Sequence, residues 1–157
     1  MKGERNGKGK EYNYNGILEY EGEYFNGEKN RKIKEYDYDG ILEYEGEYFN
    51  GKRNGKGKEY HDNGKLEFEG EYLNGKKWNG KVKQYFVCGE LIFEGEYING
   101  KRNGKGKKYN RNGELVFEGE YLNGRRWNGK GEKYDIIGKK IIEYLNGKKK
   151  FKESKLD

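Results

Sequence analysis

The stretch from Leu66 to Tyr85 reads LEFEGEYLNGKKWNGKVKQY, and the rest of the chain repeats it with variations. Its central heptad, Glu69 to Gly75, has four further copies, at Glu21 to Gly27, Glu45 to Gly51, Glu94 to Gly100 and Glu118 to Gly124. Successive copies start 24, 24, 25 and 24 residues apart. A fixed period of this length is typical of a repeat array, in which each repeat packs only on its neighbours.

The composition predicts an ordered protein without a thick core. Only 31% of the 157 residues are hydrophobic and 39% are charged, which alone would favour disorder. However, 16% are aromatic, and most of these are tyrosines, whose rings can pack while their hydroxyls remain hydrated. A thin sheet satisfies both observations. The formal net charge of +6 permits anionic partners without requiring them.

Two turn signals recur along the chain, and they predict a meander of tandem β-hairpins. Asn50-Gly51 lies inside the conserved heptad and Asn63-Gly64 lies between repeats. Asn-Gly is the strongest short hairpin signal because both residues tolerate the positive φ angles of a type I′ turn. The predicted fold is all-β: an elongated single-layer antiparallel meander, strongly twisted into a trough.

Treating both turns as two-residue loops predicts the register. Around Asn50-Gly51, Tyr48 is expected opposite Arg53, Gly46 opposite Gly55, Glu45 opposite Lys56 and Tyr44 opposite Gly57. Around Asn63-Gly64, the expected partners are Lys56 and Glu71, Gly57 and Gly70, Lys58 and Glu69, and Glu59 and Phe68. Because side chains alternate between faces, one face would carry Glu-Lys-Glu ladders and the other would carry aromatic rings interleaved with glycines.

The repeats are not identical. Trp78 and Trp127 are each an extra residue after the turn, and an inserted strand residue predicts a β-bulge. Ile33 replaces a glycine and is expected to alter local packing. The expected organisation is a repeat array over 1–134 (an N-terminal half-repeat and five full repeats), a degenerate capping hairpin over 135–147 that includes Ile136 and Ile137, and a mobile basic tail over 148–157.

The repeated residues resemble the MORN repeat (membrane occupation and recognition nexus), whose pattern is aromatic-x-Gly-x-aromatic, a turn ending in Gly, a basic residue, and Gly-x-Gly. In the cleanest repeat these positions are Tyr44, Gly46, Tyr48, Gly51, Lys52, Gly55 and Gly57. The resemblance covers roughly residues 3 to 134, with Val82 and Ile33 departing from glycine positions. It implies an array of β-hairpins that acts as a scaffold or binding module, at membranes or the cytoskeleton, or as an extension of an enzyme such as a lipid kinase.

No catalytic, metal or cofactor site is expected. His61, Cys88 and Ser154 do not combine into a nucleophile with its base, and one His and one Cys do not make a metal cluster. The Asn-Gly-Lys-Gly-Lys segments lack the Ser or Thr and the following helix of a phosphate loop. A single cysteine and the absence of an apolar leader or a long apolar run favour an intracellular protein, in the cytoplasm or peripheral at a membrane or the cytoskeleton.

Two sets of residues are candidates for binding. Basic residues follow each heptad turn and would recur along one edge of the sheet, where they could contact anionic lipid, remain solvated or meet an acidic protein. They are Lys52, Arg53, Lys76, Lys77, Lys101, Arg102, Arg125, Arg126, Lys148 and Lys149. Aromatic residues near the hairpin ends are expected to keep exposed surface for a protein partner. They are Tyr24, Tyr48, Tyr72, Tyr97 and Tyr121, with Trp78 and Trp127.

The leading hypothesis is a non-enzymatic scaffold that binds a protein segment, or a second copy of itself, along the aromatic face. The alternatives are attachment to a membrane containing phosphoinositides or other anionic lipids through the basic edge, and a regulatory role within a larger enzyme such as a lipid kinase. Nucleic acid is not favoured, because the interleaved glutamates leave no broad positive face.

Overall fold

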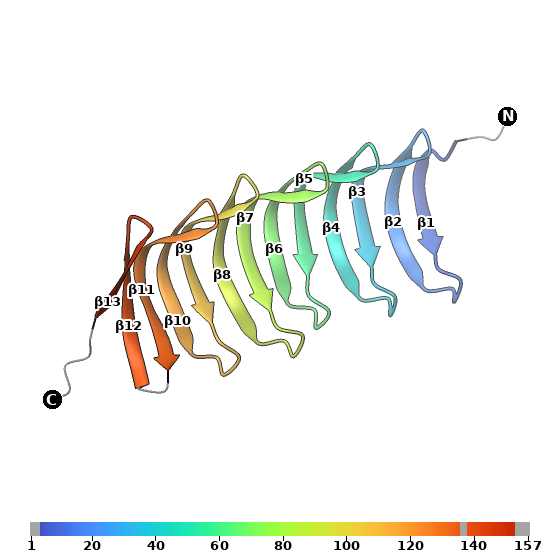
Figure 1. Ribbon diagram of the computed structural model, residues 1–157. Helices are drawn as coiled ribbons and strands as arrows, with labels where there is room; N and C mark the ends of the chain where they lie inside the picture. The colour runs from blue at the N-terminus through green and yellow to red at the C-terminus, as the bar shows by residue number, and fades with distance from the viewer. Residues whose placement is uncertain (1–3, 136–137, 153–157) are drawn as a thin grey trace. The chain divides into compact units, whose positions relative to one another are not determined.

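The computed structural model describes residues 4–135 and 138–152, and its regular structure there is entirely β-strand (Figure 1). The strands pair in sequence order in one 13-stranded antiparallel sheet, so the predicted single-layer meander is confirmed. The chain divides into two compact units, residues 1–80 and 81–157, which are described separately below.

The first unit contains β1 (Gly7–Tyr12), β2 (Leu18–Phe25), β3 (Glu28–Tyr36), β4 (Leu42–Phe49), β5 (Lys52–Tyr60) and β6 (Leu66–Leu73), and β7 (Lys76–Tyr85) begins in it. The second contains the remainder of β7 and then β8 (Leu91–Ile98), β9 (Lys101–Tyr109), β10 (Leu115–Leu122), β11 (Arg125–Asp135), β12 (Gly138–Leu145) and β13 (Lys148–Lys152).

The C-terminal segment differs from the sequence-based expectation. Residues 148–152 form β13, which pairs with β12, so this part of the predicted mobile tail is a strand. Ile136 and Ile137 of the predicted capping hairpin, and residues 153–157 of the predicted tail, lie outside the described residues.

The two kinds of turn have different geometries. Asn50 and Gly51 both have positive φ, at 48° and 69°, as a type I′ turn requires. The turn between repeats is longer, because the His61 amide donates to the Lys65 carbonyl and the Gly64 amide to the His61 carbonyl. Only the glycine of that turn is left-handed, as in a three-residue hairpin loop.

The register predicted between repeats is confirmed. Gly57 faces Gly70 and Lys58 faces Glu69. Within the heptad hairpin the prediction is correct only for the first two pairs beyond the turn. Gly46 faces Gly57 instead of Gly55, so Glu45 faces Lys58 instead of Lys56, and Tyr44 faces Glu59 instead of Gly57.

A bulge at Gly55 causes this shift. Gly55 has a φ of 93°, a left-handed value that glycine adopts without strain. The chain therefore bulges between the Tyr48–Arg53 and Gly46–Gly57 pairs. The Glu47 carboxylate accepts a hydrogen bond of 2.8 Å from the Lys56 amide, which this bulge removes from the ladder. The same disposition of Glu96 against Gly104, with a φ of 72°, recurs in the second unit.

The bulge predicted at Trp127 is present in a different form. Tyr121 faces Arg126 and Glu120 faces Asn128, so Trp127 is the single extra residue. Gly119 then faces Gly129, the first glycine of the Gly-x-Gly pair. Around Trp78, Asn79 Nδ2 donates to Glu71, as Asn128 does to Glu120, which is consistent with the same bulge.

The core is one layer of aromatic rings lying flat on glycine rows. Tyr44, Phe68, Phe93 and Phe117 are at most 1% exposed. A Cβ on Gly57 would stand 2.4 Å from the Tyr44 hydroxyl, so only glycine leaves room for the ring. The edge-to-face pairs that bind these rings to their neighbours have centroids 5.1 Å apart for Tyr44 and Tyr72 and 5.2 Å apart for Phe93 and Tyr121.

Ile33 changes this layer where it replaces a glycine. It pairs with Gly22 on one side and Gly46 on the other, and its side chain is 1% exposed. Its Cδ1 reaches within 2.7 Å of the Cβ position of Gly22, so it fills the space that a ring occupies in the next repeat. Tyr20 accordingly remains partly exposed.

Candidate functional site

Each unit has a groove on the charged face of its sheet. The groove of the first unit has a volume of about 980 Å³ and that of the second about 570 Å³. Their floor is the central glycine row, and their walls are the charged residues on either side of it. Glu-Gly-Glu triplets on even-numbered strands alternate with Lys-x-Lys triplets on odd-numbered strands, as in Glu45 to Glu47 beside Lys56 to Lys58.

The grooves lie on the opposite face of the sheet from the aromatic rings, along which the bound segment was expected. Rings such as Tyr44 and Phe68 lie on the other face and do not line the groove. Because the glycines have no side chains, the strand backbone is open on the charged face between two walls of long side chains. The floor of the groove is therefore exposed backbone.

The two walls of the groove differ in how their charges are used. On one wall, three of the five lysines pair with glutamates facing them across the strands: Lys10–Glu21 at 3.3 Å, Lys58–Glu69 at 3.5 Å and Lys107–Glu118 at 3.2 Å. On the other wall, the glutamates are hydrogen-bonded to the bulge or to an asparagine of the next strand. The lysines of that second wall are exposed and form no ion pair with any side chain that the structure describes. They are Lys8, Lys32 and Lys56 in the first unit and Lys81 and Lys105 in the second.

The face of the sheet that carries the aromatic rings, here called the ring face, contains in the first unit a charge network centred on Glu59. The Glu59 carboxylate accepts hydrogen bonds from Arg53 Nη1 at 2.9 Å and from the Tyr72 hydroxyl at 2.8 Å, and it pairs with Lys77 Nζ at 2.7 Å. Arg53 also donates to Glu35, and its guanidinium stacks 4.3 Å from the centre of the Tyr44 ring. Burial alone would lower the pKa of Arg53, but Glu35 and Glu59 more than offset this and raise it. Burial, and then Glu59, raises the pKa of Tyr72.

Packing in the ring layer makes most of the candidate tyrosines inaccessible. Tyr24, Tyr48, Tyr72 and Tyr121 are at most 9% exposed, so the expectation that they keep exposed surface is wrong. Their rings are held against the glycine rows and the neighbouring rings. Tyr97, Trp78 and Trp127 are partly exposed. The Trp127 ring lies against Gly147, in the turn of the following hairpin.

The candidate basic residues separate into two groups. The second residue of each pair lies over an aromatic ring: Arg53 on Tyr44, Lys77 on Phe68, Arg102 on Phe93, Arg126 on Phe117 and Lys149 on Phe151. The first four are partly buried, and Lys149 is exposed. The first residue of each pair is exposed: Lys52, Lys76, Lys101, Arg125 and Lys148. The predicted basic edge therefore has about half of the expected free cations.

An apolar row accompanies these exposed cations, and the sequence analysis did not single it out. The residue before each heptad turn is apolar and exposed: Phe25, Phe49 and Leu73 in the first unit, and Ile98, Leu122 and Leu145 in the second. Phe49 faces Lys52 and Leu122 faces Arg125 across their turns. The pairing of an apolar residue with a cation at each turn could have been recognised from the repeat itself.

The side chains that could act as metal ligands do not cluster in residues 4–135 and 138–152. No group of three or more His, Cys, Asp or Glu side chains there could hold a metal ion. His61 lies in a turn of the first unit, and Cys88 is exposed in a turn of the second. No helix of the described chain is long and apolar enough to cross a membrane.

The fold and the grooves define an array of tandem β-hairpins built to present surfaces. The array contains MORN repeats: the MORN repeat variant matches residues 5–26 and 53–74, and the MORN repeat matches residues 93–114. A comparison with curated proteins found no match. Repeats of this family are interaction modules for proteins and membranes and are not typically catalytic.

Proposed function

We propose that this chain is a scaffold that binds an extended, acidic protein segment in the groove on the charged face. The observation that carries the proposal is the row of unpaired lysines along one wall, beside a wall on which Lys10, Lys58 and Lys107 are already paired with glutamates. These lysines stand on every second strand, so they recur about 9.6 Å apart. The groove floor is backbone, which leaves room for a chain to lie along the row.

The spacing favours one conformation of the bound segment. In a β-strand, side chains on one face recur about every 6.7 Å, which does not match the lysine row. In a polyproline II helix, side chains on one face recur every third residue, or about 9.3 Å. A segment in this conformation with an acidic residue at every third position would place one carboxylate opposite each lysine. Such a segment loses little entropy on binding, because its conformation is already formed.

A designed peptide tests this proposal directly. A fluorescent (Glu-Pro-Pro)₆ peptide should bind the protein, and binding should weaken as salt is added, while (Lys-Pro-Pro)₆ should not bind. The double variant Lys32→Glu, Lys56→Glu should lower the affinity of the acidic peptide at least tenfold. A matched change of charge outside the groove, Lys52→Glu with Lys76→Glu, should lower it less than threefold. Equal losses in the two double variants, or no binding of the acidic peptide, would reject the groove.

A second candidate function is attachment to an anionic membrane through the hairpin ends. The observation that favours it is the exposed row of apolar residues, each next to an exposed cation in four of the repeats. Apolar side chains can enter the interface while neighbouring cations contact lipid headgroups, at about 1 kcal/mol for each cation.

Vesicle sedimentation tests this second candidate. The protein should pellet with phosphatidylserine vesicles at low salt and remain in solution with phosphatidylcholine vesicles. Ile98→Asp with Leu122→Asp should abolish pelleting, while Lys81→Glu with Lys105→Glu, in the groove, should reduce it only slightly. Failure to pellet with anionic vesicles at low salt would exclude this function.

A further inference from the structure

One position on the ring face changes the sign of its charge between the two units. In the first unit it is occupied by Glu59, which faces Tyr44 on one side and Phe68 on the other. In the second unit the same place, between Phe93 and Phe117, is occupied by Lys108. The rings on either side still carry their stacked guanidinium groups, Arg102 at 4.2 Å and Arg126 at 4.6 Å.

The exchange leaves three cations together. Arg102 donates to the neutral amide of Gln84, and Arg126 donates to the Tyr144 hydroxyl at 2.9 Å. None of Arg102, Lys108 and Arg126 forms an ion pair with a described side chain, whereas Arg53 contacts three glutamates in the first unit. All three are partly buried. Burial, and then the charges of Arg126 and Arg102, lowers the pKa of Lys108, which shows that the cations oppose one another.

An independent observation places an unused hydrogen-bond donor at the same point. Tyr121 stands edge-on to both Phe93 and Phe117, with ring centroids 5.2 Å away in each case. It is 4% exposed, and its hydroxyl has no hydrogen-bond partner among the described residues. The equivalent hydroxyl in the first unit, that of Tyr72, donates to Glu59. Exchanging Glu59 for Lys108 therefore removes the acceptor and leaves its donors in place.

The other buried hydroxyl without a partner is in a different environment. Tyr24, in the first unit, lies near the Glu11 carboxylate, and burial together with that carboxylate raises its pKa to about 12. Charges near Tyr121 are of the opposite sign, from Arg126 and Arg102. Of these two hydroxyls, that of Tyr121 is the one that lies beside uncompensated positive charge.

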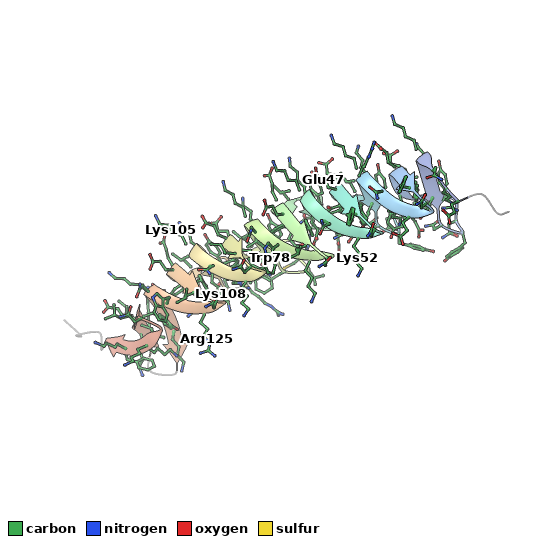
Figure 2. All side chains as sticks on the ribbon, turned by 90° about the horizontal axis from the view of Figure 1, so that it is seen from above. Glu47, Lys52, Trp78, Lys105, Lys108 and Arg125 are labelled. Atoms are coloured by element: carbon green, nitrogen blue, oxygen red, sulfur yellow. The ribbon has the colours of Figure 1, made fainter. Side chains whose placement is uncertain are left out.

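We propose that Arg102, Lys108, Arg126 and the Tyr121 hydroxyl form a binding site for a carboxylate, supplied by a Glu or Asp side chain of an acidic protein segment. The first unit shows the complex that this implies, because there the Glu59 carboxylate joins Arg53, Lys77 and the Tyr72 hydroxyl. Two guanidinium groups with a hydroxyl offer the planar donors that a carboxylate accepts. The site lies on the ring face and is distinct from the groove: Figure 2 shows Lys105, of the groove, and Lys108 projecting to opposite sides of β9.

The variant Lys108→Glu tests whether the cluster of cations is a binding site or only a structural defect. In Lys108→Glu the new carboxylate should occupy the site as Glu59 does, so the protein should become more stable to heat while losing affinity for external carboxylates. The matched control is Lys105→Glu, which makes the same change of charge on the same strand but on the other face. The probe is the peptide Ac-Gly-Glu-Glu-Gly-NH₂, with Ac-Gly-Gln-Gln-Gly-NH₂ as its neutral control. Binding is followed by NMR of the Arg Nε–H signals.

The acidic peptide should shift the signals of Arg102 and Arg126 to saturation, and the neutral peptide should not. Lys108→Glu should weaken this binding at least tenfold and raise the melting temperature, while Lys105→Glu should change the affinity less than twofold. The proposal is overturned if the two variants weaken binding equally, if the acidic peptide leaves both arginines unshifted, or if Lys108→Glu lowers the melting temperature. It is also overturned if inorganic phosphate saturates the site at concentrations where the acidic peptide does not bind, because the ligand would then be a phosphate.

Discussion

Replacing Gly46 with alanine should destabilise the first unit far more than a typical glycine replacement in a strand. An added Cβ would lie 2.6 Å from the Gly57 Cα, 2.7 Å from the Lys56 carbonyl oxygen and 2.3 Å from the Tyr44 hydroxyl. The Tyr44 ring could rotate away only by leaving its place in the ring layer, where it is fully buried. The two backbone contacts belong to the neighbouring strand β5 and cannot be relieved by a rotamer change.

The geometry sets the magnitude. Ordinary van der Waals contact begins at about 3.4 Å, so β4 and β5 would have to separate locally by roughly 0.7 Å at the Lys56 oxygen. Overpacking of this kind costs about 1–3 kcal/mol, and each weakened ladder hydrogen bond adds about 1 kcal/mol. We therefore expect Gly46→Ala to lower the free energy of unfolding by about 3 kcal/mol, with alanine's better conformational entropy regaining less than about 1 kcal/mol.

The matched control is Gly9→Ala in β1. Its Cβ would meet only the ring atoms of Tyr24, at 3.1 and 3.2 Å, and its φ is not left-handed. A side chain can move by the few tenths of an ångström that this contact requires, so a loss below about 1 kcal/mol is expected. Urea unfolding followed by tyrosine fluorescence measures both. Equal losses in the two variants, or a loss below 1 kcal/mol for Gly46→Ala, would refute the explanation of the glycine rows.

Three further outcomes are expected. Glu59→Gln should lower the stability of the first unit by about 2 kcal/mol, because it weakens three hydrogen bonds of the network; if Tyr72→Phe in the same background costs as much as it does in the wild type, the two groups are not coupled. Deleting Trp127 should shift the partner of Gly119 from Gly129 to Gly131, the register seen at Gly46–Gly57, and cross-strand Hα–Hα NOEs would show whether it does. The contribution of Tyr36, Tyr60 and Tyr109 to stability should be constant below pH 10, the ordinary tyrosine pKa, and should fall as pH rises towards 12. The native state holds these protons more tightly, because burial and a glutamate acceptor raise the pKa of three hydroxyls to about 12, in Tyr36, Tyr60 and Tyr109. The tyrosinate absorbance of the folded protein and the free energy of unfolding, each measured as a function of pH, check this prediction. Absorbance midpoints near pH 10 in the folded protein would contradict it.

The sequence predicts the elements of this fold well because their signals are local. The period, the Asn-Gly turns and the alternation of charge and ring were sufficient for the strand order and for the register between repeats. The register inside the heptad hairpin could not be predicted, because glycine serves two purposes here. Gly55 is needed for its left-handed φ, and Gly57 is needed because a ring lies on it. Both positions are glycine in the sequence, and only the structure shows which role each glycine has.

The candidate site was harder to predict for a related reason. Tyrosine was expected to keep its hydroxyl in water. In this sheet the hydroxyl can instead donate a hydrogen bond to a glutamate of the neighbouring strand, as Tyr72 does to Glu59. Exposure therefore depends on whether the repeat supplies an acceptor. That condition is invisible in a single repeat and becomes visible only when corresponding positions of successive repeats are compared.

At the position that corresponds to Glu59, the earlier repeats have glutamate and the later ones have Gln84, Lys108 and Lys133. A repeat array allows this change because each repeat contributes its own ring, guanidinium and hydroxyl, so losing one acceptor does not disturb the strand order. The exchange leaves like charges together at Lys108, where burial and then the charges of Arg126 and Arg102 lower its pKa. Departures from local consistency of this kind are expected where a protein binds something. The cluster at Lys108 is therefore better explained by a counter-charge that a partner supplies than by drift of a solvent-facing position, since its arginines remain stacked in the places that served a carboxylate.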